Sequence, residues 1–141
     1  MNTSEIGNIG QAAVVNKFIQ LGVEVYLPFG EGYTADLIAK WDNKLYKIQI
    51  KTTENVLKDS YMDWGTTHQE GYHGNRKKYS NNEIDYFALY CIQSKTLCLV
   101  PFSEIGDVNV FRIRLDSYSG IRKTGMHFES DYKFENYISS K

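Results

Sequence analysis

The sequence predicts an α/β fold in which a mixed central sheet is flanked by helices. An N-terminal segment has the apolar spacing of a helix, several later segments have the alternation or the apolar runs of strands, and a short turn joins two of these strands. The chain has 141 residues, of which 42% are hydrophobic. We therefore expect one domain over residues 1–141 with a modest core.

The first expected element is a helix from Thr3 or Ser4 to about Leu21. Thr3 or Ser4 can cap its start, and Gly22 ends it. Its apolar positions follow helical spacing: Val14, Val15, Phe18 and Leu21. Gln11 precedes the first three of them by three, four and seven residues, so it shares their face. A polar side chain is therefore expected on the face that meets the core.

Three strands are expected after this helix. VEVYLPF is a short strand, GEGY a glycine-rich turn, and TADLIAKW and KLYKIQIKTT form a hairpin joined by a tight turn at Asp42-Asn43. Side chains alternate across a strand, so Ile48 and Ile50 share one face of the last strand. The opposite face of that strand is polar: Lys47, Gln49 and Lys51. A strand that served only the core would not need these polar groups.

The second half of the chain is predicted to add more strands. Residues 53–82 have weak periodicity and are expected to form a long irregular excursion, which is uncommon in a compact domain unless it has a function. Strands are expected at 84–89 and 97–102, followed by a short helical turn near Glu104. The segments VNVFRIRLD and MHF are expected to be further strands.

Composition excludes several classes of protein. The net charge of −1 argues against a uniformly basic nucleic-acid binder but leaves room for local patches. No segment approaches the roughly 20 apolar residues of a membrane span, and MNTSEIG lacks the features of a signal peptide, so we expect a cytoplasmic protein with no membrane partner. Cys91 and Cys98 are expected to be buried thiols. The histidines lack the close spacing of a zinc site: His68, His73 and His127.

The polar residues of the helix and the hairpin are predicted to meet at one site. The antiparallel register of a short hairpin brings Asp36 close to Gln49 and Lys51. A hard divalent cation takes oxygen ligands and is held by one or two carboxylates together with substrate phosphate. Asp36 supplies a carboxylate, Gln49 an amide oxygen, and Lys51 can offset negative charge or orient water. Taken singly, Asp36 could be an ordinary strand-end carboxylate and Gln11 a satisfied buried amide; the combination suits phosphodiester hydrolysis.

Asp36, Gln49 and Lys51 match the D…(E/Q)xK signature of the PD-(D/E)XK nuclease superfamily. The resemblance extends over GNIGQAAVVNKFIQLGVEVYLPFGEGYTADLIAKWDNKLYKIQIKTT and KKYSNNEIDYFALY, about the first two thirds of the chain. Within the superfamily, the chain is similar to the small homing endonucleases of cyanobacterial group I introns. The resemblance implies a restriction-endonuclease-like core, Mg²⁺ (or Mn²⁺) as cofactor, and site-specific cleavage of double-stranded DNA for intron homing.

The resemblance also implies roles for individual residues. Asp36 would be the metal-binding carboxylate, Gln49 the second metal-site residue and Lys51 the catalytic lysine. Ile50, between the last two, would belong to the metal-binding set. Gln11 would complete the catalytic set, at the position where these enzymes usually carry a glutamate on the first helix that helps bind metal.

At Gln11 the chain departs from the pattern of the superfamily. Ala35 in place of the motif's proline is a mild variation, but the loss of the helix carboxylate leaves Asp36 as the only acid of the set. A second cation would then be poorly held. Gln11 is either a Glu-to-Gln change introduced to suppress cleavage or a natural weakening of the enzyme.

Two basic clusters are candidate DNA-binding surfaces. The first combines cations with an aromatic neighbour, as surfaces that meet phosphate and sugar do: Arg76, Lys77, Lys78 and Tyr79. The second lies on a predicted strand and beyond the following turn, where a ribbon could enter a major groove: Arg112, Arg114, Arg122 and Lys123. A solvated loop and a half-exposed strand, respectively, remain the alternatives.

One active centre cuts one strand, so double-strand cleavage requires a homo-oligomer, and the resemblance is consistent with a dimer or a tetramer. Two other functions stay open on the sequence. A structure-selective resolvase or repair nuclease of the same fold would cut branched or mismatched DNA. A DNA-binding module that has lost hydrolysis would fit the missing helix carboxylate.

Overall fold

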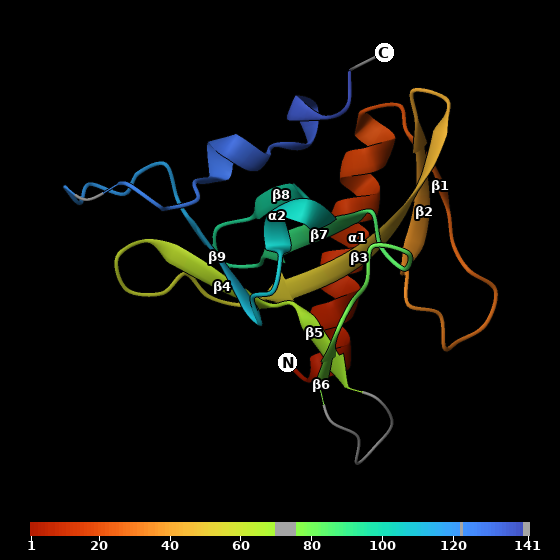
Figure 1. Cartoon of the computed structure of the whole chain (residues 1–141), viewed down its shortest axis with the longest axis horizontal. Coiled ribbons are helices and arrows are strands. Elements are labelled where there is room, and N and C mark those ends of the chain that lie inside the picture. Colours follow the sequence, from red (N-terminus) through yellow and green to blue (C-terminus); the bar gives the residue numbers. More distant parts are fainter. Residues whose placement is uncertain (70–75, 122, 140–141) are drawn as a thin grey trace.

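The computed structural model describes residues 1–69, 76–121 and 123–139. Its centre is a five-stranded sheet with the following strands in spatial order: β1 (Glu24–Tyr26), β2 (Leu37–Trp41), β3 (Lys44–Thr53), β7 (Tyr86–Cys91) and β8 (Thr96–Pro101). Neighbouring strands are antiparallel except β3 and β7, which are parallel. The sheet is therefore mixed, and the predicted α/β class is confirmed (Figure 1).

Helix α1 (Thr3–Gln20) covers one face of this sheet (Figure 1). Its cap is Asn2, whose side chain accepts a hydrogen bond from the Glu5 N–H at 2.9 Å, so the predicted capping by Thr3 or Ser4 is wrong by one or two positions. The buried stripe of α1 includes Val14 and Phe18, which pack with Ile48 and Ile50 of β3 in the first core cluster. The helix is thereby aligned with the strand that carries the predicted site.

The β2–β3 hairpin has the predicted turn and register. Asp42 and Asn43 both have positive φ, 50° and 65°, as the two central residues of a type I′ turn require. The pairs then run from Trp41 opposite Lys44 to Leu37 opposite Ile48. This register fixes where β2 ends alongside β3, and Asp36 lies directly before that end.

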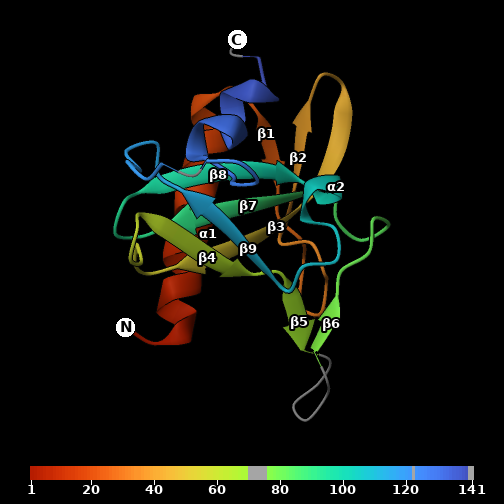
Figure 2. The same ribbon diagram turned by 60° about the vertical axis from the view of Figure 1, so that its left-hand side comes forward.

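The other face of the sheet is covered by an antiparallel ribbon of β4 (Tyr61–Gly65) and β9 (Val110–Arg114). Figure 2 shows this ribbon and α1 on opposite sides of the central sheet. Alternate residues of the ribbon are buried in the second core cluster: Met62, Trp64, Phe111 and Ile113. Their partners in that cluster include residues of β7 and β8, among them both cysteines, which are free and buried as predicted.

The prediction of an irregular excursion over residues 53–82 is wrong in part. The segment contains β4 and a small hairpin of β5 (Thr67–Gln69) and β6 (Arg76–Lys78). These strands are short, and β4 finds its partner β9 more than 40 residues later in the chain. A local pattern of three to five residues is too short to identify a strand whose partner is so distant in sequence.

The end of the chain also differs from the prediction. MHF does not form a strand; Phe128 makes a single β-bridge with Arg114, and the 3₁₀ helices η1 (Glu129–Tyr132) and η2 (Phe134–Asn136) follow. VNVFRIRLD does form a strand, although it pairs with β4 instead of joining the central sheet. The helical turn near Glu104 is α2 (Phe102–Ile105). Within the described ranges, no helix has the length and apolar character needed to cross a membrane.

Gly10 allows α1 to approach β3 closely. A Cβ atom at this position would lie 1.7 Å from Oγ1 of Thr52 and 2.9 Å from its Cβ. We expect Gly10→Ala to lower the free energy of unfolding by about 1–3 kcal/mol, the usual cost of overpacking. Urea denaturation measures this change in the free energy of unfolding.

Gly7→Ala is the matched control, because a Cβ at Gly7 meets no atom within 4 Å. Replacing a helical glycine at an open position should raise the free energy of unfolding by about 0.5–1 kcal/mol. Equal effects of the two substitutions would contradict the close approach of helix and strand at Gly10.

Candidate active site

A cleft of about 370 Å³ lies between the N-terminal half of α1 and the C-terminal half of β3. Its lining includes all the residues that the sequence analysis assigned to catalysis or metal binding: Gln11, Asp36, Gln49, Ile50 and Lys51. Helix α1 supplies the first of them, the residue before β2 the second, and β3 the other three. The structure thus brings together side chains from three separate segments.

Asp36 is fixed by the way the β2–β3 ladder ends. Its N–H donates to the Ile48 carbonyl at 2.8 Å, and its Oδ2 accepts the Ile50 N–H at 2.7 Å. The side chain therefore satisfies a strand N–H that lies just beyond the last pair, Leu37 with Ile48. This bond holds the carboxylate beside β3, where it lines the cleft.

The carboxylate of Asp36 is half-buried, and burial raises its pKa above the ordinary value. The Ile50 N–H and the charge of Lys51 oppose this shift without cancelling it. A charged group that has lost part of its hydration gains from a nearby cation. The environment of Asp36 thus favours a site for positive charge.

Gln49 and Ile50 are each 9% exposed and bring further oxygen atoms to the cleft. The Nε2 of Gln49 donates to the Ile50 carbonyl at 3.4 Å, which places amide and carbonyl side by side. With Asp36 they make a set of one carboxylate, one amide and one backbone carbonyl. In the part of the chain that the structure describes, no group of three or more His, Cys, Asp or Glu residues could hold a metal ion.

Lys51 reaches into the cleft from the same face of β3 as Gln49. Its Nζ donates to the Thr67 carbonyl at 3.2 Å and lies 5.1 Å from the centre of the Tyr79 ring. Burial lowers the pKa of this lysine; the charge of Asp36 opposes the shift and the charge of Arg76 adds to it. Thr67 could not be predicted as a partner of Lys51, because no sequence pattern marks a backbone oxygen as the acceptor for a distant lysine.

Gln11 is half-buried and faces the cleft from α1, one residue after the close contact at Gly10. The expectation that it shares the inward face of the helix agrees with the structure. An amide therefore occupies the position where a second carboxylate could reach the same cleft.

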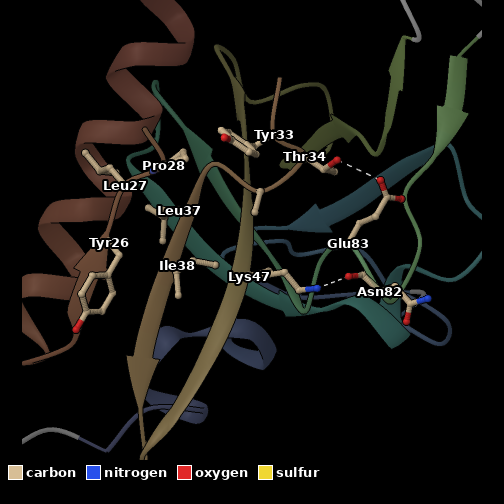
Figure 3. Close-up of a pocket in the computed structure, with 11 residues that line it drawn as sticks. Tyr26, Leu27, Pro28, Tyr33, Thr34, Leu37, Ile38, Lys47, Asn82 and Glu83 are labelled. Atoms are coloured by element: carbon tan, nitrogen blue, oxygen red, sulfur yellow. Dashed lines mark hydrogen bonds between the residues drawn. The ribbon is translucent and has the colours of Figure 1, made fainter. Parts of the chain in front are cut away.

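Lys47 shares the polar face of β3 but lies outside this cleft. Its ammonium donates to the Asn82 carbonyl, and its N–H donates to Asp85 Oδ2 at 2.8 Å. It lines a second, more apolar pocket of about 380 Å³, where Thr34 also donates to Glu83 at 3.1 Å (Figure 3). These two bonds hold the 80–85 segment against β3.

The first basic cluster is a strand instead of a loop. Arg76, Lys77 and Lys78 form β6 and are exposed. Tyr79 is only 8% exposed and packs on His68 and Phe87, so the ring does not share the surface with the cations. Tyr79, which was expected to bind DNA together with these cations, is therefore buried beside them.

The second basic cluster lies partly on the outer face of the β4–β9 ribbon. Arg112 forms two hydrogen bonds with Asp63, at 2.8 and 3.1 Å, and stacks 3.8 Å from the Tyr61 ring centre. Arg114 donates to the Asp59 carbonyl at 2.9 Å. Lys123 is exposed, and Arg122 lies outside the described residues.

The site thus combines a carboxylate beside the end of one strand with an amide and an ammonium on the next, a set that suits a divalent cation and a phosphate. The model of the PD-(D/E)XK endonuclease family matches residues 1–135, and the chain belongs to this family. The prediction that it is an endonuclease acting on DNA is thereby confirmed.

A solved structure of similar fold is that of the bacterial homing endonuclease I-Ssp6803I. It superimposes with a TM-score of 0.73 at 18% sequence identity, over 94% of this chain and 88% of the other. At this identity the likeness concerns the fold. Comparison with curated proteins gives no match.

Proposed function

We propose that the protein is a site-specific homing endonuclease that makes metal-dependent double-strand breaks in DNA. The observation that carries the proposal is the convergence of Asp36, Gln49 and Lys51 in one open cleft. The shared fold of a bacterial homing endonuclease supports the homing role, and intron homing is the biological purpose that we assign to the cleavage.

The oxygen atoms of the cleft fit a hard divalent cation. Mg²⁺ (or Mn²⁺) is commonly held by one or two carboxylates while it keeps several waters, and this cleft offers one carboxylate. Asp36, the Gln49 amide and the Ile50 carbonyl would hold the ion. When bound, it would supply Lewis-acid stabilisation of the phosphate and an activated water.

The protein's own groups provide the rest of the chemistry. Lys51 presents an ammonium to the phosphate as negative charge builds up on it, because Thr67 and Tyr79 hold the side chain in place. Partial burial of Asp36 and Lys51 strengthens their electrostatic effects relative to those in bulk water. Asp36 also keeps β3 aligned with the cleft through the Ile50 N–H.

The two basic surfaces are proposed to bind the DNA duplex. The exposed cations of β6 belong to the hairpin that holds Lys51, so phosphate contacts there would lie near the cleft. Arg112 and Arg114 stand two apart on one face of a two-stranded ribbon, a shape that fits a major groove. Lys123, with Arg122 beside it in sequence, would add phosphate contacts.

The active form is proposed to be a homo-oligomer, either a dimer or a tetramer. Each chain contributes one cleft, and one cleft cuts one strand. Two copies related by symmetry are therefore needed for a double-strand break at a near-palindromic target.

The test of this function is cleavage of DNA carrying the intron-free allele of the host gene, with magnesium present. Gln11→Glu adds a second carboxylate to the cleft and should raise the rate by about 10–100-fold, the usual scale for groups that support a metal site. Gel electrophoresis of the linear product measures the rate of cleavage. Four-way junctions and mismatched duplexes, included as rival substrates, should be cut less well.

Gln20→Glu is the matched control, because it makes the same chemical change at the exposed far end of α1. It should leave the rate unchanged. The amide at Gln11 favours one rival function, a DNA-binding module without hydrolysis. DNA binding by the Gln11→Glu form without any cleavage in magnesium would support that rival and overturn the nuclease proposal for this chain.

A further inference from the structure

The tertiary contacts of Lys51 come from both ends of the β5–β6 hairpin. Thr67, the first residue of β5, accepts a hydrogen bond from the ammonium at 3.2 Å. Tyr79, the residue directly after β6, lies with its ring centre 5.1 Å from the same nitrogen. Thr67 pairs with Lys78, so the two ends are adjacent across the hairpin. The ammonium is held from two directions by one small element.

The ring of Tyr79 is itself fixed. It packs on the His68 ring at 4.5 Å and meets the Phe87 ring edge to face at 5.5 Å. Phe87 lies on β7 opposite Gln49 of β3, so the ring is anchored to the strand next to the site. With 8% of its surface exposed, Tyr79 has little freedom to turn.

We propose that Tyr79 is a positioning residue for Lys51. The face of the Tyr79 ring keeps the Lys51 ammonium at the active cleft. The attraction of a cation to an aromatic face fixes the end of a flexible side chain that would otherwise sample many rotamers. Only the effect of this contact on cleavage rests on the proposed function, because the contact itself exists in the free protein. Burial raises the pKa of Tyr79 to about 12.

The position of Tyr79 also connects it to the proposed DNA surface. It follows Lys78, the last of the three exposed cations of β6, without an intervening residue. A duplex bound along β6 would therefore hold the strand that directly precedes Tyr79. The same short segment then contacts the substrate and orients the catalytic lysine.

The first test is nuclear magnetic resonance of the free protein. A lysine above a ring face has its Hε signals shifted upfield by the ring current, and the Lys51→Arg variant identifies which signals belong to Lys51. We expect upfield Lys51 signals in the unmodified protein and in Tyr79→Phe, which keeps the ring. Tyr79→Leu should move them to the position of ordinary lysines. Unshifted Lys51 signals in the unmodified protein would overturn the proposal even if Tyr79→Leu failed to fold.

The second test is kinetic and uses the intron-free target with magnesium. Tyr79→Leu should lower kcat by about tenfold, the order expected for a partly buried cation–aromatic contact, with the KM for DNA unchanged and with full rescue in Tyr79→Phe. Equal kcat values for the Leu and Phe variants would overturn the positioning role. If the Lys51 signals were upfield but no variant cleaved DNA, the contact would be established and the proposed function would be overturned.

Discussion

Asp36→Asn is expected to lower magnesium-dependent cleavage by about 10³-fold or more while leaving the fold intact. The amide oxygen can still accept the Ile50 N–H, which Asp36 Oδ2 now accepts at 2.7 Å, so the end of the ladder should persist. The substitution removes the single carboxylate of the proposed metal site. The bound ion would stabilise charge in the transition state by several kcal/mol, and the loss of that stabilisation corresponds to the expected fall in rate. Cleavage kinetics and DNA binding, measured on the same preparation, test the prediction.

Asp42→Asn is the control for this substitution. Asp42 is exposed in the β2–β3 turn with a φ of 50°, a conformation that asparagine accepts readily. The same loss of one negative charge, on the same hairpin but outside the cleft, should leave cleavage unchanged. If both variants lost activity equally, the effect would be one of overall charge and the role of Asp36 would be refuted.

Lys51→Ala is the second large effect that we expect, with a loss of about 10²–10³-fold in kcat, the scale for removing one preorganised group that stabilises developing charge. DNA affinity should change little, because Lys51 lines the cleft while the proposed phosphate contacts are on β6 and the ribbon. A filter-binding or fluorescence-anisotropy titration separates the two quantities. Loss of binding in parallel with loss of cutting would mark Lys51 as structural.

Lys47→Ala is the matched control on the same face of the same strand. Its ammonium is bonded to Asn82 outside the cleft, so its removal should cost some stability without lowering kcat. The contrast between Lys47 and Lys51 tests whether position in the cleft, and not positive charge on β3, determines catalysis.

Much of the site could be predicted because it rests on local rules. The alternation of side chains along KIQIK fixed the shared face of Gln49 and Lys51, and the tight Asp42-Asn43 turn fixed the register that brings Asp36 to them. Helical spacing predicted that Gln11 lies on the inward face of α1. These inferences need only one strand, one turn and one helix, all close in sequence.

The parts that were missed depend on contacts between distant segments. Nothing near Tyr61–Gly65 in sequence indicates that it pairs with Val110–Arg114, and without that ribbon the 53–82 segment looks irregular. Tyr79 was assigned to the surface because its neighbours are cations. Its burial depends on His68 and Phe87, which meet it only in the folded hairpin and sheet.

The most direct measurement of the central claim is the anomalous scattering of Mn²⁺ in crystals of the protein with its DNA target. We expect a manganese ion in direct contact with the Asp36 carboxylate, beside Gln49 and Ile50 and next to a phosphate of the target. Loss of that ion in Asp36→Asn crystals should accompany the loss of cutting. Manganese bound elsewhere, with Asp36 turned away from every phosphate, would contradict the assignment of this cleft as the active site.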